Sequence, residues 1–87
     1  MRQVMLTLTN PAGLHARPAA ELVKAAARFK SRIVLEGNGK KADAKSIILV
    51  LGLGLRQNDS ITIRADGEDE EAAIQMLAEL VKQRFHE

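Results

Sequence analysis

The sequence predicts a single α+β domain over residues 1–87, a two-layer sandwich in which helices cover one face of one β-sheet. The first reason is length, because 87 residues can bury one modest core but not two. The second reason is periodicity, since short alternating segments are interleaved with segments whose apolar residues recur at helical spacing. The third reason is the resulting order, β-α-β-β-α-β-α, in which one hairpin and two helical crossovers join the strands.

The N-terminal third predicts a strand followed by a helix. Residues 4–8 have a period of two, which indicates a strand, and residues 10–13 (Asn-Pro-Ala-Gly) are typical of a turn. From residue 16 to about Phe29 the apolar residues fall on one helical face. Pro18 is tolerated there because it lies in the first turn, where its missing N–H loses no helical hydrogen bond.

The next segment predicts a hairpin. Residues 32–36 form a short β-branched run, and Gly37-Asn38-Gly39 after it is typical of a hairpin turn. Residues 40–43 are then the returning strand, which is short and polar.

The apolar run at residues 47–51 is compatible with a buried strand or a short helix on periodicity alone. Ser46 before the run is a good N-cap, and Gly52 and Gly54 after it are typical of a helix end. These flanking residues favour a short helix.

The C-terminal part predicts a turn at residues 56–59, a strand at residues 60–65 and a last helix that begins with the acidic stretch at residues 66–71. The apolar stripe of that helix consists of Ile74, Leu77, Leu80, Val81 and Phe85. Carboxylates at its start, with Lys82 and Arg84 near its end, complement the helix dipole.

Composition narrows the classes of function. Cysteine is absent, which excludes disulfides and thiolate metal sites and fits the cytoplasm. No apolar run approaches the ~18 residues of a membrane span, so we expect no membrane insertion. Residues 1–64 carry 11 Lys and Arg against 4 Asp and Glu, whereas residues 65–87 carry 2 against 7. The basic part either attracts an acidic protein or a phosphate, or is only a solvated surface.

A small nucleic-acid-binding domain is an alternative that the same basic part motivates. Phe29 and Phe85 are the only aromatic residues, and Arg/Gly-rich stretches are absent. Because single-stranded nucleic acids are usually held on aromatic side chains, we expect no direct nucleic-acid partner.

The most unusual stretch, Gly13-Leu14-His15-Ala16-Arg17-Pro18, places a histidine at the predicted helix start. The first-turn N–H groups of a helix have no partner inside the helix, so they point toward a group held on His15. The positive end of the helix dipole favours a bound anion, and the fork of the Arg17 guanidinium suits phosphate oxygens. A neutral imidazole is a nucleophile, so His15 is a candidate phosphoryl acceptor, with Arg17 as phosphate ligand and Pro18 stiffening the turn.

Other interpretations of His15 stay open on residue types alone. It can be a surface histidine that happens to precede a helix. A metal site is less favoured, because the other histidine, His86, lies beside the C-terminus. A hydrolytic site is also less favoured, since neither a Ser/His/Asp order nor paired carboxylates surround His15 in the sequence. Gly52-Leu53-Gly54 lacks the third spaced glycine of a dinucleotide site, so we expect no cofactor.

Ser46 has a structural and a regulatory interpretation. As an N-cap it contributes about 1 kcal/mol and needs no other role. As a phosphorylation site it would place negative charge beside Ile47 and Leu51. Where the side chains of this run are exposed they form a docking surface, and where they are buried they belong to the core.

Over its whole length the chain resembles HPr, the histidine phosphocarrier family of the bacterial phosphoenolpyruvate:sugar phosphotransferase system. Residues 13–18 carry the resemblance, together with Ala44-Lys45-Ser46-Ile47 in the middle of the chain. Leu53-Gly54 and the closing acidic helix also fit. The resemblance implies an open-faced two-layer β-sandwich, with four antiparallel strands under three helices.

The resemblance also implies a carrier rather than an enzyme. His15 would accept a phosphoryl group on Nδ1 from phosphorylated enzyme I and pass it to sugar-specific enzyme IIA domains. Arg17 would assist the transfer and Pro18 would shape the site. The implied partner-binding residues are Ala16, Ala20, Lys24, Ile47, Ile48 and Leu51. We expect the carrier to be a monomer.

The match at Ser46 implies a second, regulatory phosphorylation by an ATP-dependent HPr kinase/phosphorylase. The product would act as corepressor of a transcription factor in carbon catabolite control. A nitrogen-related HPr paralogue is an alternative, because it shares the His15 motif. A purely regulatory binding module, with Ser46 as its switch, is another. Ala12 stands where the family often has a polar residue, so one phosphate contact is lost there.

Overall fold

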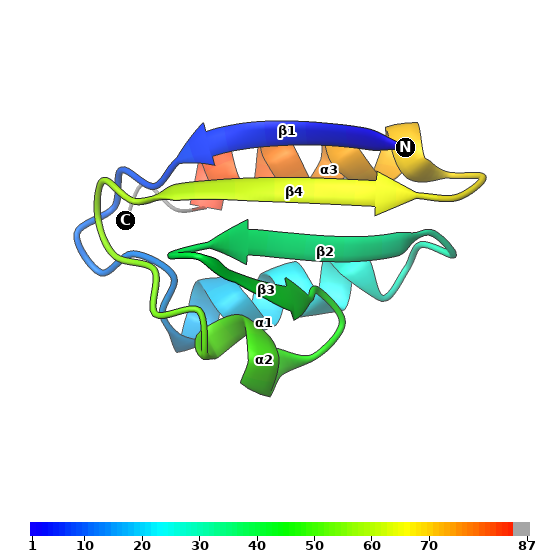
Figure 1. Ribbon diagram of the computed structural model, residues 1–87. Helices are drawn as coiled ribbons and strands as arrows, with labels where there is room; N and C mark the ends of the chain where they lie inside the picture. Colours follow the sequence, from blue (N-terminus) through cyan, green and yellow to red (C-terminus); the bar gives the residue numbers. More distant parts are fainter. Residues whose placement is uncertain (85–87) are drawn as a thin grey trace.

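The computed structural model describes residues 1–84, and it confirms the predicted α+β open-faced sandwich (Figure 1). In chain order the elements are β1 (Arg2–Thr7), α1 (Ala16–Ala26), β2 (Arg32–Gly37), β3 (Lys40–Asp43), α2 (Ile47–Leu51), β4 (Ser60–Asp66) and α3 (Glu70–Arg84). The four strands form one antiparallel sheet in the order β1-β4-β2-β3. Helices α1 and α3 lie behind this sheet in Figure 1, and α2 packs on α1 beside β3. None of the helices within residues 1–84 is long and apolar enough to cross a membrane.

The register of the strands places the apolar residues on the helix-covered face. Ile63 of β4 lies opposite Val4 of β1 on one side and Leu35 of β2 on the other. Ile61 and Ile63 are fully buried, whereas Thr62 between them faces the open side of the sheet. Aliphatic side chains from both layers form the core, which consists of Leu8, Leu14, Ala19, Leu22, Ala26, Ile33, Leu35, Ala42, Ala44, Val50, Leu53, Leu55, Ile61, Ile63, Ala65, Ala73, Leu77 and Val81.

The predicted hairpin turn is present between β2 and β3, and it is a two-residue turn because Gly37 belongs to β2. Gly37 pairs with Lys40, and both residues between them are left-handed, with φ of 52° at Asn38 and 74° at Gly39. This is the backbone that an Asn-Gly hairpin turn requires, because its twist matches the twist of the flanking strands.

Helix α1 ends at Ala26, so the predicted end near Phe29 was wrong by three residues. The chain tightens after Ala26, because the N–H groups of Arg28 and Phe29 donate to carbonyls only three residues earlier. The ammonium group of Lys45 donates to the Phe29 carbonyl oxygen at 2.8 Å, which supplies a partner to the chain just after the helix end.

The first strand and the last helix also differ from their predicted bounds. Leu8 lies beyond the end of β1, yet it is fully buried, and its N–H donates to the Asp59 carbonyl at 2.9 Å. Helix α3 begins at Glu70 rather than within residues 66–69, because β4 continues to Asp66. Three predictions lie outside the part that the structure describes. They are the place of Phe85 in the apolar stripe, the position of His86 and the effect of the Arg84 side chain on the helix dipole.

Candidate functional site

His15 is the N-cap residue of α1, as predicted. Its backbone is extended, with φ −95° and ψ −175°, and its carbonyl oxygen accepts the N–H of Ala19 at 3.0 Å. The His15 side chain makes no capping hydrogen bond, and the residue is exposed. The imidazole is therefore available to a reactant at the positive end of the helix.

A buried asparagine holds the loop that carries His15. Asn10 is 1 % exposed, its side-chain amide donates to the Gly13 carbonyl at 2.7 Å, and its own carbonyl accepts the N–H of Gly13 at 3.1 Å. The N–H of His15 donates to the same Gly13 carbonyl at 3.1 Å. The turn before the helix is thus fixed from inside the molecule, which limits the positions that the imidazole can adopt.

The same loop lies directly against the segment before β4. The N–H of Leu14 donates to the Leu55 carbonyl at 3.1 Å. Gly13 has φ +62°, and a Cβ atom placed on it would lie 2.5 Å from that Leu55 oxygen and 2.6 Å from the Cα of Arg56. Only glycine fits here, because both the backbone conformation and the lack of space exclude a side chain.

Arg17 and Pro18 complete the first turn of α1. Arg17 is exposed, and its guanidinium has no hydrogen bond or ion pair with any residue that the structure describes. Pro18 is buried in the first turn, as predicted. An unpaired guanidinium beside an exposed imidazole can bind the oxygens of an anion carried on that imidazole.

The other predicted residues of α1 share one side of the helix. Ala16, Ala20 and Lys24 are four residues apart, so they lie one above the other along the helix. Ala16 and Lys24 are exposed and Ala20 is half-buried. Helix α2 packs against α1.

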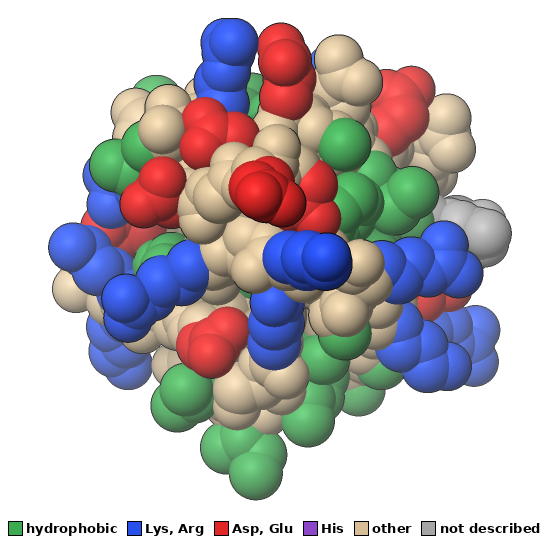
Figure 2. Space-filling view, turned by 90° about the vertical axis from the view of Figure 1, so that its right-hand side faces the viewer, with side chains coloured by type: hydrophobic (Ala, Val, Ile, Leu, Met, Phe, Trp, Pro, Cys, Tyr) green, Lys and Arg blue, Asp and Glu red, His purple; other side chains and the backbone are tan. Residues whose placement is uncertain are grey.

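Helix α2 has both exposed and buried apolar side chains, the two arrangements that the sequence left open. Ile48 is 78 % exposed, Leu49 52 % and Leu51 39 %. Ile47 is half-buried against the core, and Val50 is completely buried. Hydrophobic side chains gather at the lower edge of Figure 2, where α2 lies. The α2 patch, consisting of Ile48, Leu49 and Leu51, is therefore unpartnered apolar surface.

Ser46 is the N-cap of α2, so its predicted structural role is confirmed. Its hydroxyl oxygen accepts the N–H of Leu49 at 3.4 Å, which is a long hydrogen bond, and the residue is half-buried. Lys45 beside it is held by its bond to the Phe29 carbonyl.

A cluster of acidic residues lies at the opposite end of the molecule from His15. Figure 2 looks at the end where α3 begins, and acidic side chains cluster in its upper half. They come from the β4–α3 connection and the first turn of α3, namely Asp66, Glu68, Asp69, Glu70 and Glu71. The N–H of Gly67 and the N-terminal amine hold the pKa of Glu70 below its usual value. An anion at His15 is thus spared close repulsion from this cluster.

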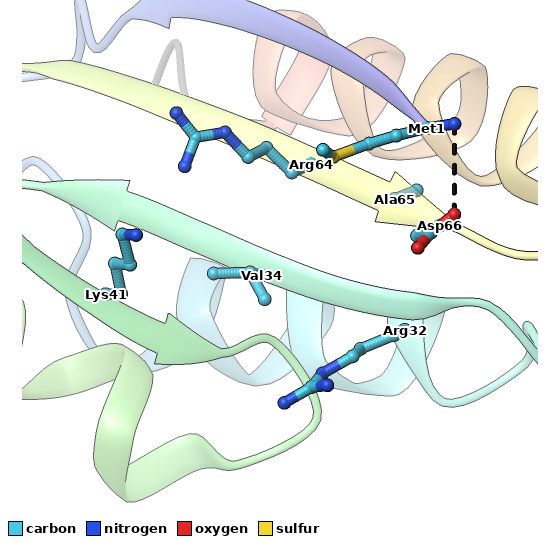
Figure 3. A pocket seen from close by; sticks show the side chains of 7 residues that line it. All are labelled: Met1, Arg32, Val34, Lys41, Arg64, Ala65 and Asp66. Carbon is cyan, nitrogen blue, oxygen red and sulfur yellow. Dashed lines mark ion pairs between the residues drawn. The ribbon is translucent and has the colours of Figure 1, made fainter.

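A hollow of about 190 Å³ lies on the open face of the sheet (Figure 3). Apart from Arg32, the charged groups that line it have ion-pair partners. Arg64 and Lys41 contact the Glu36 carboxylate at 3.0 and 3.7 Å, and the N-terminal amine lies 3.8 Å from Asp66. Because the helices lie on the other face of the sheet, the hollow is separate from the His15 site.

Sequence reasoning missed three residues around the site. Asn10 has a local signal, since an asparagine three residues before a glycine is typical of a turn closed by its side chain. Leu49 could be found only by knowing which side of α2 faces the core. Arg56 has no local signal, because it is 41 residues from His15 in the chain. In residues 1–84, no three His, Cys, Asp or Glu side chains are placed to hold a metal ion.

Comparison with known proteins gives a consistent result. The family described as the PTS HPr component phosphorylation site matches residues 3–83. A phosphocarrier protein HPr of Xylella fastidiosa is 46 % identical over 82 residues, which cover 94 % of this chain and 92 % of that protein. The crystal structure of HPr from Thermoanaerobacter tengcongensis is 42 % identical, with TM-score 0.92 over 98 % of this chain and 96 % of that one. Crh, a catabolite repression protein of Bacillus subtilis that forms a swapped dimer in its crystal, is 41 % identical, with TM-score 0.75 over 95 % of each chain.

Proposed function

Because the chain belongs to the HPr family of phosphocarrier proteins, we propose that it carries a phosphoryl group on the imidazole of His15. The group would come from phosphorylated enzyme I and pass to enzyme IIA domains in the cytoplasm, with the carrier acting as a monomer. The observation that carries this proposal is that the His15 side chain at the N-terminus of α1 is exposed and makes no capping hydrogen bond.

The transfer is an exchange of a P–N bond between two imidazoles. The lone pair of Nδ1 on neutral His15 attacks the phosphorus atom, and the bond between that phosphorus and the donor imidazole breaks. The His15 ring gives up one proton to solvent and the donor ring takes one up, so charge balances. The first-turn N–H groups and the Arg17 guanidinium would hold the transferred oxygens, which carry about two negative charges.

The second part of the proposal is the docking surface. The α2 patch offers exposed apolar area, and α2 packs against α1, the helix that carries Ala16, Ala20 and Lys24. We assign partner binding to this combined surface, with Ile47 supporting it from the core side. An apolar centre with a basic rim suits a partner whose contact surface is apolar and acidic.

Labelling with phosphoenolpyruvate and enzyme I tests the carrier function. We expect one acid-labile phosphate on the wild-type protein and none on His15→Ala. The matched control is His86→Ala, since His86 is the only other histidine, and it should be labelled like the wild type. Equal labelling of His15→Ala would refute the proposal. Comparing enzyme I of the sugar system with that of the nitrogen system distinguishes the two HPr branches.

A second candidate function is regulatory phosphorylation of Ser46. The similarity to Crh, a catabolite repression protein, favours it, as does the exposure of the apolar residues beside Ser46. An ATP-dependent HPr kinase/phosphorylase would produce an acid-stable phosphate, and the product would bind a catabolite-control transcription factor. Ser46→Ala should abolish this label, whereas the exposed Ser60→Ala should retain it. Acid-stable labelling without any reaction with enzyme I would instead indicate a purely regulatory module.

A further inference from the structure

The segment before β4 lies beside the loop that carries His15. Hydrogen bonds join them on both sides of residue 56: Leu14 N–H donates to the Leu55 carbonyl at 3.1 Å, and the Gln57 side chain donates to the Thr9 carbonyl at 3.2 Å. Figure 1 shows both segments at the same end of the sheet, at the left, where α1 begins. Residue 56 is therefore held between two anchors to the His15 loop.

The backbone of Arg56 is close to His15. A Cβ atom on Gly13 would lie 2.6 Å from the Cα of Arg56. His15 is two positions after Gly13, so their Cα atoms are at most about 7 Å apart. The Arg56 N–H donates to the Asp59 carboxylate at 2.9 Å, and the Arg56 carbonyl accepts the Asp59 N–H at 3.1 Å. These bonds fix the backbone and leave the long side chain free to reach the site.

Arg17 alone does not neutralise the charge of a phosphoryl group on His15. A phosphoryl group carries about two negative charges near neutral pH, and Arg17 supplies one positive charge. The next cation along α1 is Lys24, which is about 13 Å farther along the helix than His15. Arg56 is exposed, and its guanidinium makes no ion pair with any carboxylate in residues 1–84.

We propose that Arg56 is a second phosphate-binding arginine of the His15 site, opposite Arg17. This inference rests on the proposed function and adds a group that binds the phosphoryl oxygens. Arg17 approaches from the first turn of α1 and Arg56 from the adjacent segment, so the two guanidinium groups hold the phosphoryl group from two sides.

Phosphoramidate, a small phosphoryl donor, tests the inference without any protein partner. The His15 imidazole attacks the phosphorus, the P–N bond of phosphoramidate breaks, and the leaving nitrogen departs as ammonium with the proton released by the His15 ring. Since no docking surface is involved, the rate reports on the groups around His15. The variants are Arg56→Gln and Arg56→Lys.

Two controls remove the same charge elsewhere. Arg28→Gln removes an exposed arginine beyond the far end of α1. Lys40→Gln removes a cation at the β2–β3 turn, which lies at the same end of the sheet as His15 (Figure 1). Thermal unfolding of each variant verifies that the fold is intact.

We expect Arg56→Gln to slow labelling of His15 by roughly threefold to tenfold, and both controls to stay within about 1.5-fold of wild type. Arg56→Lys should recover part of the rate. Equal rates for Arg56→Gln and the two controls would overturn the inference, and so would a loss that Arg56→Lys does not restore at all. A defect seen only with enzyme I as donor would also overturn it, because Arg56 would then contact the partner.

The inference and the carrier function fail in different ways. If enzyme I labels His15→Ala as well as wild type, the carrier function fails. If labelling is confined to His15 and Arg56→Gln matches its controls, the carrier function stands and only the role of Arg56 fails.

Discussion

The carboxylate of Asp69 accepts hydrogen bonds from both the hydroxyl and the N–H of Ser31, so it ties the chain before α3 to the start of β2. The N–H of Lys30 donates to the second oxygen of the same carboxylate at 2.8 Å. The hydrogen bond from the Ser31 hydroxyl, and to a smaller extent that from the Lys30 N–H, holds the pKa of Asp69 below its ordinary value of 3.8. This contact joins the α1–β2 connection to the β4–α3 connection, at the end of the molecule opposite His15.

The lowered pKa of Asp69 predicts a specific acid sensitivity. Its contribution to stability is complete above the ordinary value of 3.8 and is lost as pH falls through the lowered native pKa. Asp69→Asn should therefore have a lower free energy of unfolding than wild type at about pH 6. Between about pH 6 and about pH 3, its free energy of unfolding should fall by less than that of wild type. Urea unfolding at the two pH values measures both effects.

The control for this prediction is Glu68→Gln, which removes an exposed carboxylate from the same connection. It should change neither stability nor its pH dependence. Some acid sensitivity should persist in Asp69→Asn, because the pKa of Glu70 is lowered as well. Parallel pH curves for wild type and Asp69→Asn would contradict the role assigned to this carboxylate.

Replacing Gly13 by alanine should both destabilise the fold and slow labelling of His15. The matched control is Gly39→Ala, because Gly39 has a similar φ of +74° but open space around it. Gly39→Ala should lower the free energy of unfolding by about 1 kcal/mol, because alanine is strained in the left-handed conformation. Gly13→Ala should lower it by about 3 kcal/mol, because the new methyl group must also displace Leu55 and Arg56. Denaturant unfolding separates the two costs, and equal values would show that the close approach is unimportant.

Local sequence signals predicted much of this structure. The Asn38-Gly39 turn and the Ser46 cap each depend on residues within one turn, so their chemistry can be recognised in the sequence. The strand order β1-β4-β2-β3 has no such signal, since β1 pairs with a strand more than fifty residues later. The candidate site divides in the same way. His15 and Arg17 were found from one motif, whereas the approach of Arg56 depends on that long-range packing.

Ser46→Ala should lower stability by about 0.5 kcal/mol, at the low end for an N-cap, because the bond from Leu49 N–H to the Ser46 hydroxyl is long, at 3.4 Å. Ser46→Asp should retain full stability, since a carboxylate accepts the same N–H. Urea unfolding of both variants checks this, with Ser60→Ala as the control at an exposed serine. A loss above about 2 kcal/mol for Ser46→Ala would show that the hydroxyl has a further structural role.

Ile48→Ser should weaken productive docking without affecting the fold. Ile48 is 78 % exposed, so the change in unfolding free energy should stay within about 0.5 kcal/mol. Loss of an apolar contact at an interface centre should raise the KM for phosphorylation by enzyme I roughly tenfold. Met5→Ser is the control, because Met5 is 69 % exposed on the open face of the sheet. Equal KM values for the two variants would move the docking surface away from α2.

Arg17→Glu should separate the chemistry of the site from its stability. Reversing this charge beside His15 repels the incoming phosphoryl oxygens, so we expect the rate of transfer to fall roughly hundredfold or more. Arg17 is exposed and unpaired within the described residues, so no native contact is lost. A carboxylate in the first turn of α1 also complements the helix dipole, and the melting temperature should therefore stay the same or rise slightly.

The matched variant Arg28→Glu places the same change just beyond the C-terminal end of α1. Negative charge is unfavourable near that end of a helix, so this variant should melt slightly lower, yet it should be phosphorylated nearly as fast as wild type. Of the two variants, Arg17→Glu should thus melt at the higher temperature but transfer the phosphoryl group more slowly. Measurement of both quantities on both proteins is decisive, because a structural role for Arg17 would lower them together in Arg17→Glu.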